Sequence, residues 1–171
     1  DNSLVHGPVE ALFTVDEETG LTGAGNLGEG MIKGDILINL DSEDEALIFM
    51  GCAGGIDTTV TFDYTKTAPT ANYHFLKINF SGMQGGHSGS DIDKGRANAN
   101  KVMARFVWKL MQKFNVEVAE ISGGNLRNAI AREANVTIGF PADKKEEVTV
   151  DLNNYIADLD VEYKGIENIK I

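Results

Sequence analysis

Two short, largely apolar runs near the start of the chain each end in acidic residues. The first run, residues 9–15, leads into the Asp-Glu-Glu triplet of residues 16–18, and the second run, residues 36–40, leads into Asp41. Strands that are apolar on both faces are usually buried in parallel sheets, and ligands bind at their carboxyl ends. We therefore predict two buried strands whose acidic tips share one cation site, because unpaired buried carboxylates are costly.

A divalent metal ion held by these carboxylates would support hydrolysis. Zinc and magnesium both accept carboxylate oxygens as ligands. A bound metal ion lowers the pKa of its water to about 7, so that a neighbouring Glu can accept the proton as a general base. The alternative interpretation is a solvated acidic turn with no ligand.

Residues 23–28 form a literal Gly-x-Gly-x-x-Gly, and Asp41 lies 18 residues after Gly23. In a dinucleotide-binding unit this motif directly follows a strand and opens a helix. Here seven mostly polar residues separate Val15 from Gly23, and residues 29–34 are too short and Gly-rich for a crossover helix. Nucleotide binding is therefore kept only as a minor alternative.

A second Gly-rich loop, residues 85–90, contains His87. Ser88 is not expected to be a nucleophile, because the nucleophile elbow has Gly at the position that Ser90 occupies. His87 has two interpretations: a solvent-facing loop residue, or an imidazole presented to a substrate oxygen.

A third polar loop, residues 123–128, holds two Gly, two Asn and Arg127. It is either a simple turn or a site for a carboxylate, because Arg binds carboxylates in a fork and Asn amides donate hydrogen bonds.

The composition excludes several classes of protein. The formal charge of −11 argues against a nucleic-acid partner, because phosphate binding needs a basic face. No apolar run approaches the roughly 20 residues that span a bilayer, so no membrane partner is expected. The single cysteine, Cys52, excludes an intrachain disulfide and suits a reducing compartment such as the cytoplasm.

Periodicity predicts an α+β arrangement from about residue 58 onward: an antiparallel sheet with two helices on one face. The expected strands are residues 58–65, 73–80, 116–121, 135–140 and 161–163. The expected helices carry apolar stripes over residues 99–114 and 148–159, with Asp91 or Asp93 capping the first helix and Asp143 the second. The first fifty residues are expected to be a remnant of an α/β domain. We place the domain boundary after residue 50, giving domains 1–50 and 51–171.

Five segments, taken together and in order, resemble the aminoacyl-histidine dipeptidase family (Xaa-His dipeptidases, peptidase D). This family belongs to the two-zinc superfamily of carboxypeptidases, aminoacylases and carnosinases. The resemblance implies an α/β catalytic domain with an inserted α+β lid, and a cytoplasmic homodimer formed through the lid. The segments are residues 13–20, 40–43, 85–89, 94–101 and 124–130.

The resemblance also implies roles in the catalytic half of the site. Glu17 would be the general base, Glu18 would be a metal ligand, and Asp41 would be a terminal ligand of the other zinc ion. The reaction would be hydrolysis of dipeptides with C-terminal histidine, by water activated between two zinc ions.

In the lid half, the resemblance implies that His87 stabilises the tetrahedral intermediate, in the active site of a partner subunit. Asn128 and Arg127 would contact the substrate. One position departs from the family, which usually has Pro after Asn-Ala-Ile, where this chain has Ala131.

Three ligands that the family needs have no match in this chain: an early His-x-Asp motif, a bridging Asp and a late His. His6 and His74 fit neither His pattern. We therefore expect a central fragment of the enzyme that binds zinc weakly and is inactive alone. The alternatives are a non-enzymatic dimerisation module, or a related carnosinase, tripeptidase or deacylase.

Overall fold

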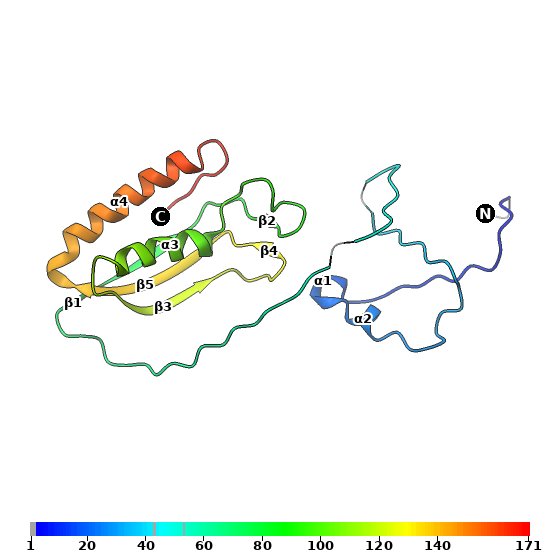
Figure 1. Cartoon of the computed structure of the whole chain (residues 1–171), viewed down its shortest axis with the longest axis horizontal. Helices are drawn as coiled ribbons and strands as arrows, with labels where there is room; N and C mark the ends of the chain where they lie inside the picture. The colour runs from blue at the N-terminus through cyan, green and yellow to red at the C-terminus, as the bar shows by residue number, and fades with distance from the viewer. Residues whose placement is uncertain (1–2, 43, 53) are drawn as a thin grey trace. The chain divides into compact units, whose positions relative to one another are not determined.

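A three-stranded antiparallel sheet organises the second half of the chain in the computed structural model (Figure 1), which describes residues 3–42, 44–52 and 54–171. The strand order is β1 (Tyr73–Phe80), β5 (Ala134–Pro141), β3 (Glu117–Gly123). β5 therefore lies in the centre and pairs with a neighbour on each edge, with a register shift in its pairing with β3.

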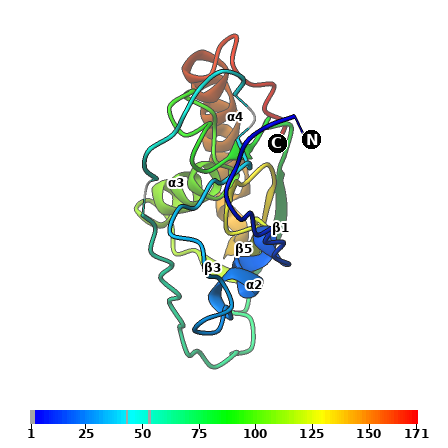
Figure 2. The same ribbon diagram turned by 90° about the vertical axis from the view of Figure 1, so that its right-hand side faces the viewer.

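One face of this sheet is buried under two helices, α3 (Ala99–Met111) and α4 (Lys145–Glu162). Figures 1 and 2 show the two helices beside each other. Alternate residues of β5, which point to one face, form a single apolar core with the stripe of α3. The core includes Ala134, Val136, Ile138 and Phe140 from β5, Val102, Phe106 and Leu110 from α3, and Val148, Tyr155 and Leu159 from α4.

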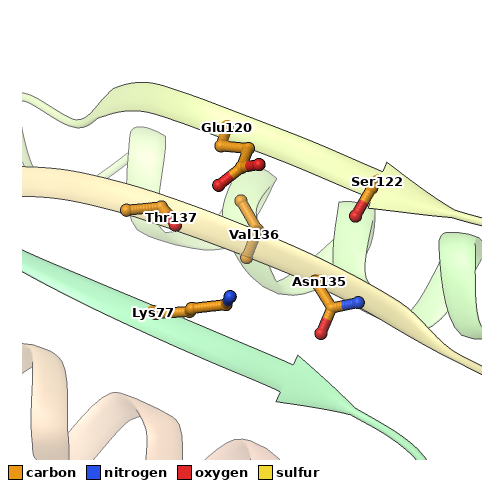
Figure 3. A pocket seen from close by; sticks show the side chains of 6 residues that line it. All are labelled: Lys77, Glu120, Ser122, Asn135, Val136 and Thr137. Atoms are coloured by element: carbon orange, nitrogen blue, oxygen red, sulfur yellow. The ribbon is translucent and has the colours of Figure 1, made fainter.

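The other face of the sheet carries several polar side chains. Figure 3 shows a pocket on this face, lined by residues from all three strands. They are Lys77 from β1, Glu120 and Ser122 from β3, and Asn135, Val136 and Thr137 from β5. The prediction of an α+β unit with an antiparallel sheet and its helices on one face is confirmed.

A polar network joins the two helices across the edge of the core. The buried Tyr155 hydroxyl donates to the carbonyl of Val102 at 2.8 Å and accepts from Arg105 Nε at 2.9 Å. Arg105 also forms a bidentate ion pair with Glu162, with Nη1–Oε1 and Nη2–Oε2 distances of 3.0 and 2.7 Å. Burial raises the pKa of Tyr155, and the Arg105 hydrogen bond lowers that of Glu162.

Two shorter strands carry the loops on which the sequence analysis focused. β2 (Gly86–His87) pairs antiparallel with β4 (Ala129–Ile130) as a separate two-stranded sheet. A 3-10 turn (Ala142–Lys144) leads from β5 into α4. Asp143 lies within this turn, and no side chain caps the first residue of α4, so the predicted cap is wrong.

Four predicted strands are absent. Residues 9–15 and 36–40 are not strands and are exposed, as Phe13 at 90% and Ile36 at 85% show. Residues 58–65 are likewise irregular and exposed, and residues 161–163 belong to the end of α4 and the following turn. An extended segment becomes a strand only when a neighbouring strand satisfies its backbone groups, and no strand pairing in the described part of the chain includes the first three segments.

The chain divides into two compact units, one ending at Thr61 and the other running from Phe62 to Ile171. The first unit contains two four-residue helices, α1 (Glu17–Gly20) and α2 (Thr22–Gly25), which the sequence analysis did not predict. The assignment of residues 1–50 to a catalytic domain and 51–171 to a lid stays a prediction. No helix in the described part of the chain is long and apolar enough to cross a membrane.

The start of α3 gives a direct test of the helix cap. Asn98 caps it by accepting from the backbone N–H groups of Asn100 and Lys101, at 3.0 and 3.3 Å. Asn98→Ala is expected to lower the free energy of unfolding by about 1 kcal/mol. Urea unfolding followed by the fluorescence of Trp108, the single tryptophan, measures this change.

Asp93→Ala is the matched control, because the sequence analysis named Asp93 as one of two possible caps and the structure places it outside the helix. We expect it to change stability by less than about 0.5 kcal/mol. An equal loss for both variants would contradict the assignment of the cap to Asn98.

Candidate functional site

The structure brings two of the predicted lid residues together. His87 in β2 lies opposite Ala129 in β4. Ala129 directly follows Asn128 in the sequence. The backbone N–H of Ser88 donates to the carbonyl of Asn128 at 2.9 Å. The two loops that the sequence analysis singled out separately therefore form one continuous, hydrogen-bonded surface.

The backbone around His87 fixes its imidazole ring. The N–H groups of Gly89 and Ser90 both point at Nδ1 of His87, at 3.1 and 3.3 Å. Because both partners donate, Nδ1 must present its lone pair, and the neutral ring carries its proton on Nε2. His87 is exposed, so this N–H is accessible to an oxygen atom of a ligand.

The His87 loop, defined here as residues 85–96, is closed at its base by one carboxylate. Glu167 accepts from the backbone N–H of Gln84 at 2.8 Å and from that of Ala97 at 2.9 Å. The buried side chain of Met83 anchors the chain just before the loop. Both ends of the loop are thus attached to the core.

A charged cluster lies inside the loop. Asp91 Oδ2 accepts from the backbone N–H of His87 at 2.8 Å and lies 3.1 Å from Arg96 Nη1, while its Oδ1 lies 2.5 Å from Lys94 Nζ. The hydrogen bond from Lys94 lowers the pKa of the Asp91 carboxyl, and the N–H of His87 and the charge of Arg96 lower it further. Asp91 is therefore ionised at neutral pH. The expectation that it caps α3 is wrong, since its carboxylate is bound within the loop.

Asn128 is half-buried and Arg127 is exposed on the adjoining loop. Ala131 follows three residues later, and its carbonyl accepts from the backbone N–H of Ala99 at 2.9 Å, at the start of α3. A proline would carry the same carbonyl, so the departure from the family at Ala131 is compatible with this contact. The contacts of Asn128 and Arg127 with a substrate stay a prediction.

The acidic residues of the first unit lie in a different setting from the one predicted. Glu17 and Glu18 occupy the first turn of α1 and are exposed. Asp41 is exposed as well, and its backbone N–H donates to Asn39 Oδ1 at 3.0 Å. Among the residues that the structure describes, no group of three or more His, Cys, Asp or Glu side chains could hold a metal ion. The predicted burial of these strand tips is wrong, and the roles of the three residues stay predictions.

Gly23, the first glycine of the motif at residues 23–28, has a structural explanation. Gly23 N–H donates to the carbonyl of Val15 at 3.1 Å, and a Cβ at Gly23 would lie 2.5 Å from the Val15 nitrogen. This glycine allows two backbone segments to approach each other closely. Sequence reasoning also missed Glu10, whose carboxylate accepts from the N–H groups of Lys33 and Gly34.

Comparison with known proteins identifies the protein family to which this chain belongs. Residues 78–167, just over half of the 171 residues, match the family model of the peptidase dimerisation domain. The chain therefore belongs to the family of proteins that contain this domain.

Two relatives match nearly the whole chain. The cytosol non-specific dipeptidase of Escherichia coli (strain K12) is 43% identical over 155 residues, which is 91% of this chain and 32% of that protein. The crystal structure of aminoacylhistidine dipeptidase from Vibrio alginolyticus matches with a TM-score of 0.72 at 40% identity, covering 92% of this chain and 32% of that one. The resemblance to aminoacyl-histidine dipeptidases is confirmed, and the chain spans about a third of the length of either relative.

The close packing around Gly86 predicts a measurable cost for any side chain there. Gly86 has φ +144°, and an added Cβ would lie 2.3 Å from Arg96 Nη1 and 2.5 Å from Asp91 Oδ2. Gly86→Ala is expected to lower the free energy of unfolding by about 3 kcal/mol, through backbone strain and the broken ion pair. Thermal and urea unfolding measure this loss.

Gly165→Ala separates the two causes. Gly165 also has a positive φ, +79°, but an added Cβ would meet nothing within 4 Å. It is expected to cost only the backbone term, about 1–2 kcal/mol. Equal losses for the two variants would show that the packing against Asp91 and Arg96 contributes nothing.

Proposed function

We propose that this chain is part of a metal-dependent dipeptidase that hydrolyses dipeptides with C-terminal histidine. The observation that carries the proposal is the likeness, at 43% and 40% identity over more than nine-tenths of the chain, to two proteins named as dipeptidases. The site in this chain adds chemical support, since His87 presents an exposed imidazole N–H beside Asn128.

His87 would act as an electrophile toward the scissile carbonyl. In its Nε2-protonated form it donates a hydrogen bond to the oxygen on which negative charge develops during attack by water. Removing one preorganised donor of this type from the oxyanion hole of a serine protease costs about 2.7–4 kcal/mol of transition-state stabilisation. The backbone bonds to Nδ1 hold the ring in this form before substrate arrives.

Asn128 and Arg127 are proposed to orient the substrate. An Asn amide donates to a carboxylate or carbonyl oxygen, and a guanidinium binds a carboxylate through two parallel hydrogen bonds. The free C-terminal carboxylate of a dipeptide is a ligand of this kind. The hydrogen bond from Ser88 to the Asn128 carbonyl keeps this loop in register with His87.

Zinc, two ions per active site, is the proposed cofactor. Carboxylate oxygens suit zinc, and Glu18 and Asp41 are the residues of this chain that would hold it, together with ligands outside the described residues. When bound, the metal supplies a water of lowered pKa. Glu17 would accept the proton of that water. Its carboxylate is accessible for this role because Glu17 is exposed in the first turn of α1.

The intact protein is proposed to be a cytoplasmic homodimer that joins through residues 51–171. The match to the peptidase dimerisation domain over residues 78–167 supports the dimer. The E. coli relative is named as a cytosolic enzyme, which supports the location. A non-enzymatic dimerisation module is the second candidate, because the family match covers this part of the chain alone.

Glu17→Gln in the intact protein tests catalysis. We expect turnover of a dipeptide with C-terminal histidine to fall by at least about 100-fold, because the amide cannot accept the proton of the attacking water. Folding, measured by the thermal midpoint, is expected to stay unchanged, since Glu17 is exposed. Glu29→Gln, an exposed carboxylate outside the proposed site, is the matched control and should retain full turnover.

The substrates distinguish the related activities. The same assays should include dipeptides without histidine, a tripeptide and an N-acyl amino acid. Full turnover by Glu17→Gln would contradict the role of Glu17. Absence of hydrolysis of every substrate by the zinc-loaded wild-type protein would favour the dimerisation module.

A further inference from the structure

One ion pair holds the two peptide groups on either side of Gly86. Arg96 Nη1 donates to the carbonyl of Gly85 at 2.7 Å, and Asp91 Oδ2 accepts from the N–H of His87 at 2.8 Å. Arg96 Nη1 and Asp91 Oδ2 are themselves 3.1 Å apart. The pair thus spans Gly86, the residue of β2 that directly precedes His87.

We propose that Asp91 and Arg96 are positioning residues for His87, which set the direction and the protonated nitrogen of its ring. This inference rests on the proposed function, because it concerns how His87 is presented to a substrate oxygen. Neither residue is expected to touch the substrate.

The ion pair adds to the pairing of Gly86 with Ile130 in restraining a residue type that has the freest backbone. Gly86 has φ +144°, a backbone conformation that residues with a side chain rarely adopt. Glycine can adopt many other backbone conformations as readily, so its residue type alone does not hold this one. A change in the torsions of Gly86 would swing His87 away from the surface that it shares with Asn128. Fixing both flanking peptides removes that freedom.

The setting of the pair makes it effective. The side chains of Asp91 and Arg96 are only 16% and 22% exposed, so their attraction is less screened than that of a surface pair. Because Glu167 holds both ends of the loop, the pair acts on a segment whose base is already fixed.

Asp91 also helps to set the orientation and the tautomer of the His87 imidazole. Its own backbone N–H donates to the carbonyl of His87 at 3.1 Å, closing the turn that aims the Gly89 and Ser90 N–H groups at Nδ1. Loss of the Asp91 carboxylate would loosen both ends of this turn. The Nε2-protonated form would then lose the two donors that select it.

Lys94 provides a matched control. Its ammonium group contacts Oδ1 of Asp91 and its side chain is 53% exposed, whereas the peptide groups on either side of Gly86 are bonded by Oδ2 of Asp91 and by Arg96. Its removal changes the charge near Asp91 but leaves the pair with Arg96 and the N–H of His87 in place.

The kinetic test uses Asp91→Asn, Arg96→Ala, Arg96→Lys and Lys94→Ala in the intact protein. We expect kcat to fall about 100-fold for Asp91→Asn and Arg96→Ala, with KM nearly unchanged, because misplacing one catalytic group by about 1 Å costs this much. Arg96→Lys should restore part of the loss, and Lys94→Ala should stay within about twofold of wild type.

A double-mutant cycle separates positioning from general destabilisation. In a His87→Ala background, Asp91→Asn should cause no further loss of kcat, because it acts through the residue already removed. An additional loss of the same size in that background would overturn the proposal. So would full activity of Asp91→Asn beside an impaired His87→Ala.

A second measurement does not depend on activity. The chain has three histidines, so long-range ¹⁵N–¹H spectra of the 171-residue chain, assigned with His87→Ala, report the tautomer of His87 directly. Wild type and Lys94→Ala should show the Nε2-protonated form, and Asp91→Asn a mixture of both forms. An unchanged tautomer in Asp91→Asn overturns the positioning role, whereas an inactive wild-type protein overturns only the proposed function.

Discussion

β5 is the element on which the arrangement of residues 62–171 depends. It pairs with a strand on each edge, and four of its side chains are at most 1% exposed beneath α3 and α4. The short strand β4 ends four residues before β5 begins, and the carbonyl of Ala131 between them receives the N–H of Ala99 at the start of α3. The packing of α3 on β5 therefore fixes the place where β2 and β4 meet, and with it the surface that carries His87 and Asn128.

The periodicity of apolar residues in the sequence predicted most of this packed unit. The apolar stripes of residues 99–114 and 148–159 are α3 and α4, and the strands predicted at 73–80 and 135–140 are β1 and β5. Each of these segments finds its partners inside residues 62–171, so local pattern and tertiary contacts agree. The same reasoning was wrong for residues 9–15, 36–40 and 58–65, whose apolar side chains are exposed. Apolarity reports that a segment favours burial, but a strand also needs a neighbour for its backbone.

The candidate site was predicted in part. The Gly-rich setting of His87 and the polar loop at Asn128 are visible in the sequence, and the structure shows them hydrogen bonded to each other. The role of Asp91 was missed because an acid shortly before a helix is typical of a cap, and Asn98 fills that position instead. Its contacts with His87 and Arg96 depend on how the loop folds back, which spacing alone does not reveal. The hydrogen bonds that Glu167 accepts from Gln84 and Ala97 could not be predicted from the sequence either, because these residues lie 83 and 70 positions before Glu167.

We propose that the intact protein uses two parts of this chain in catalysis: acidic residues of the first unit, and an imidazole of the second unit that acts in a partner subunit. Subunit mixing tests this most directly. Glu17→Gln and His87→Ala variants of the intact protein would each be inactive alone. In mixed dimers, one of the two sites regains both groups, so activity should return to about a quarter of the wild-type value when subunits exchange at random. Mixtures that stay as inactive as the separate variants, despite exchange shown by differential labelling, would contradict the sharing of the site between subunits.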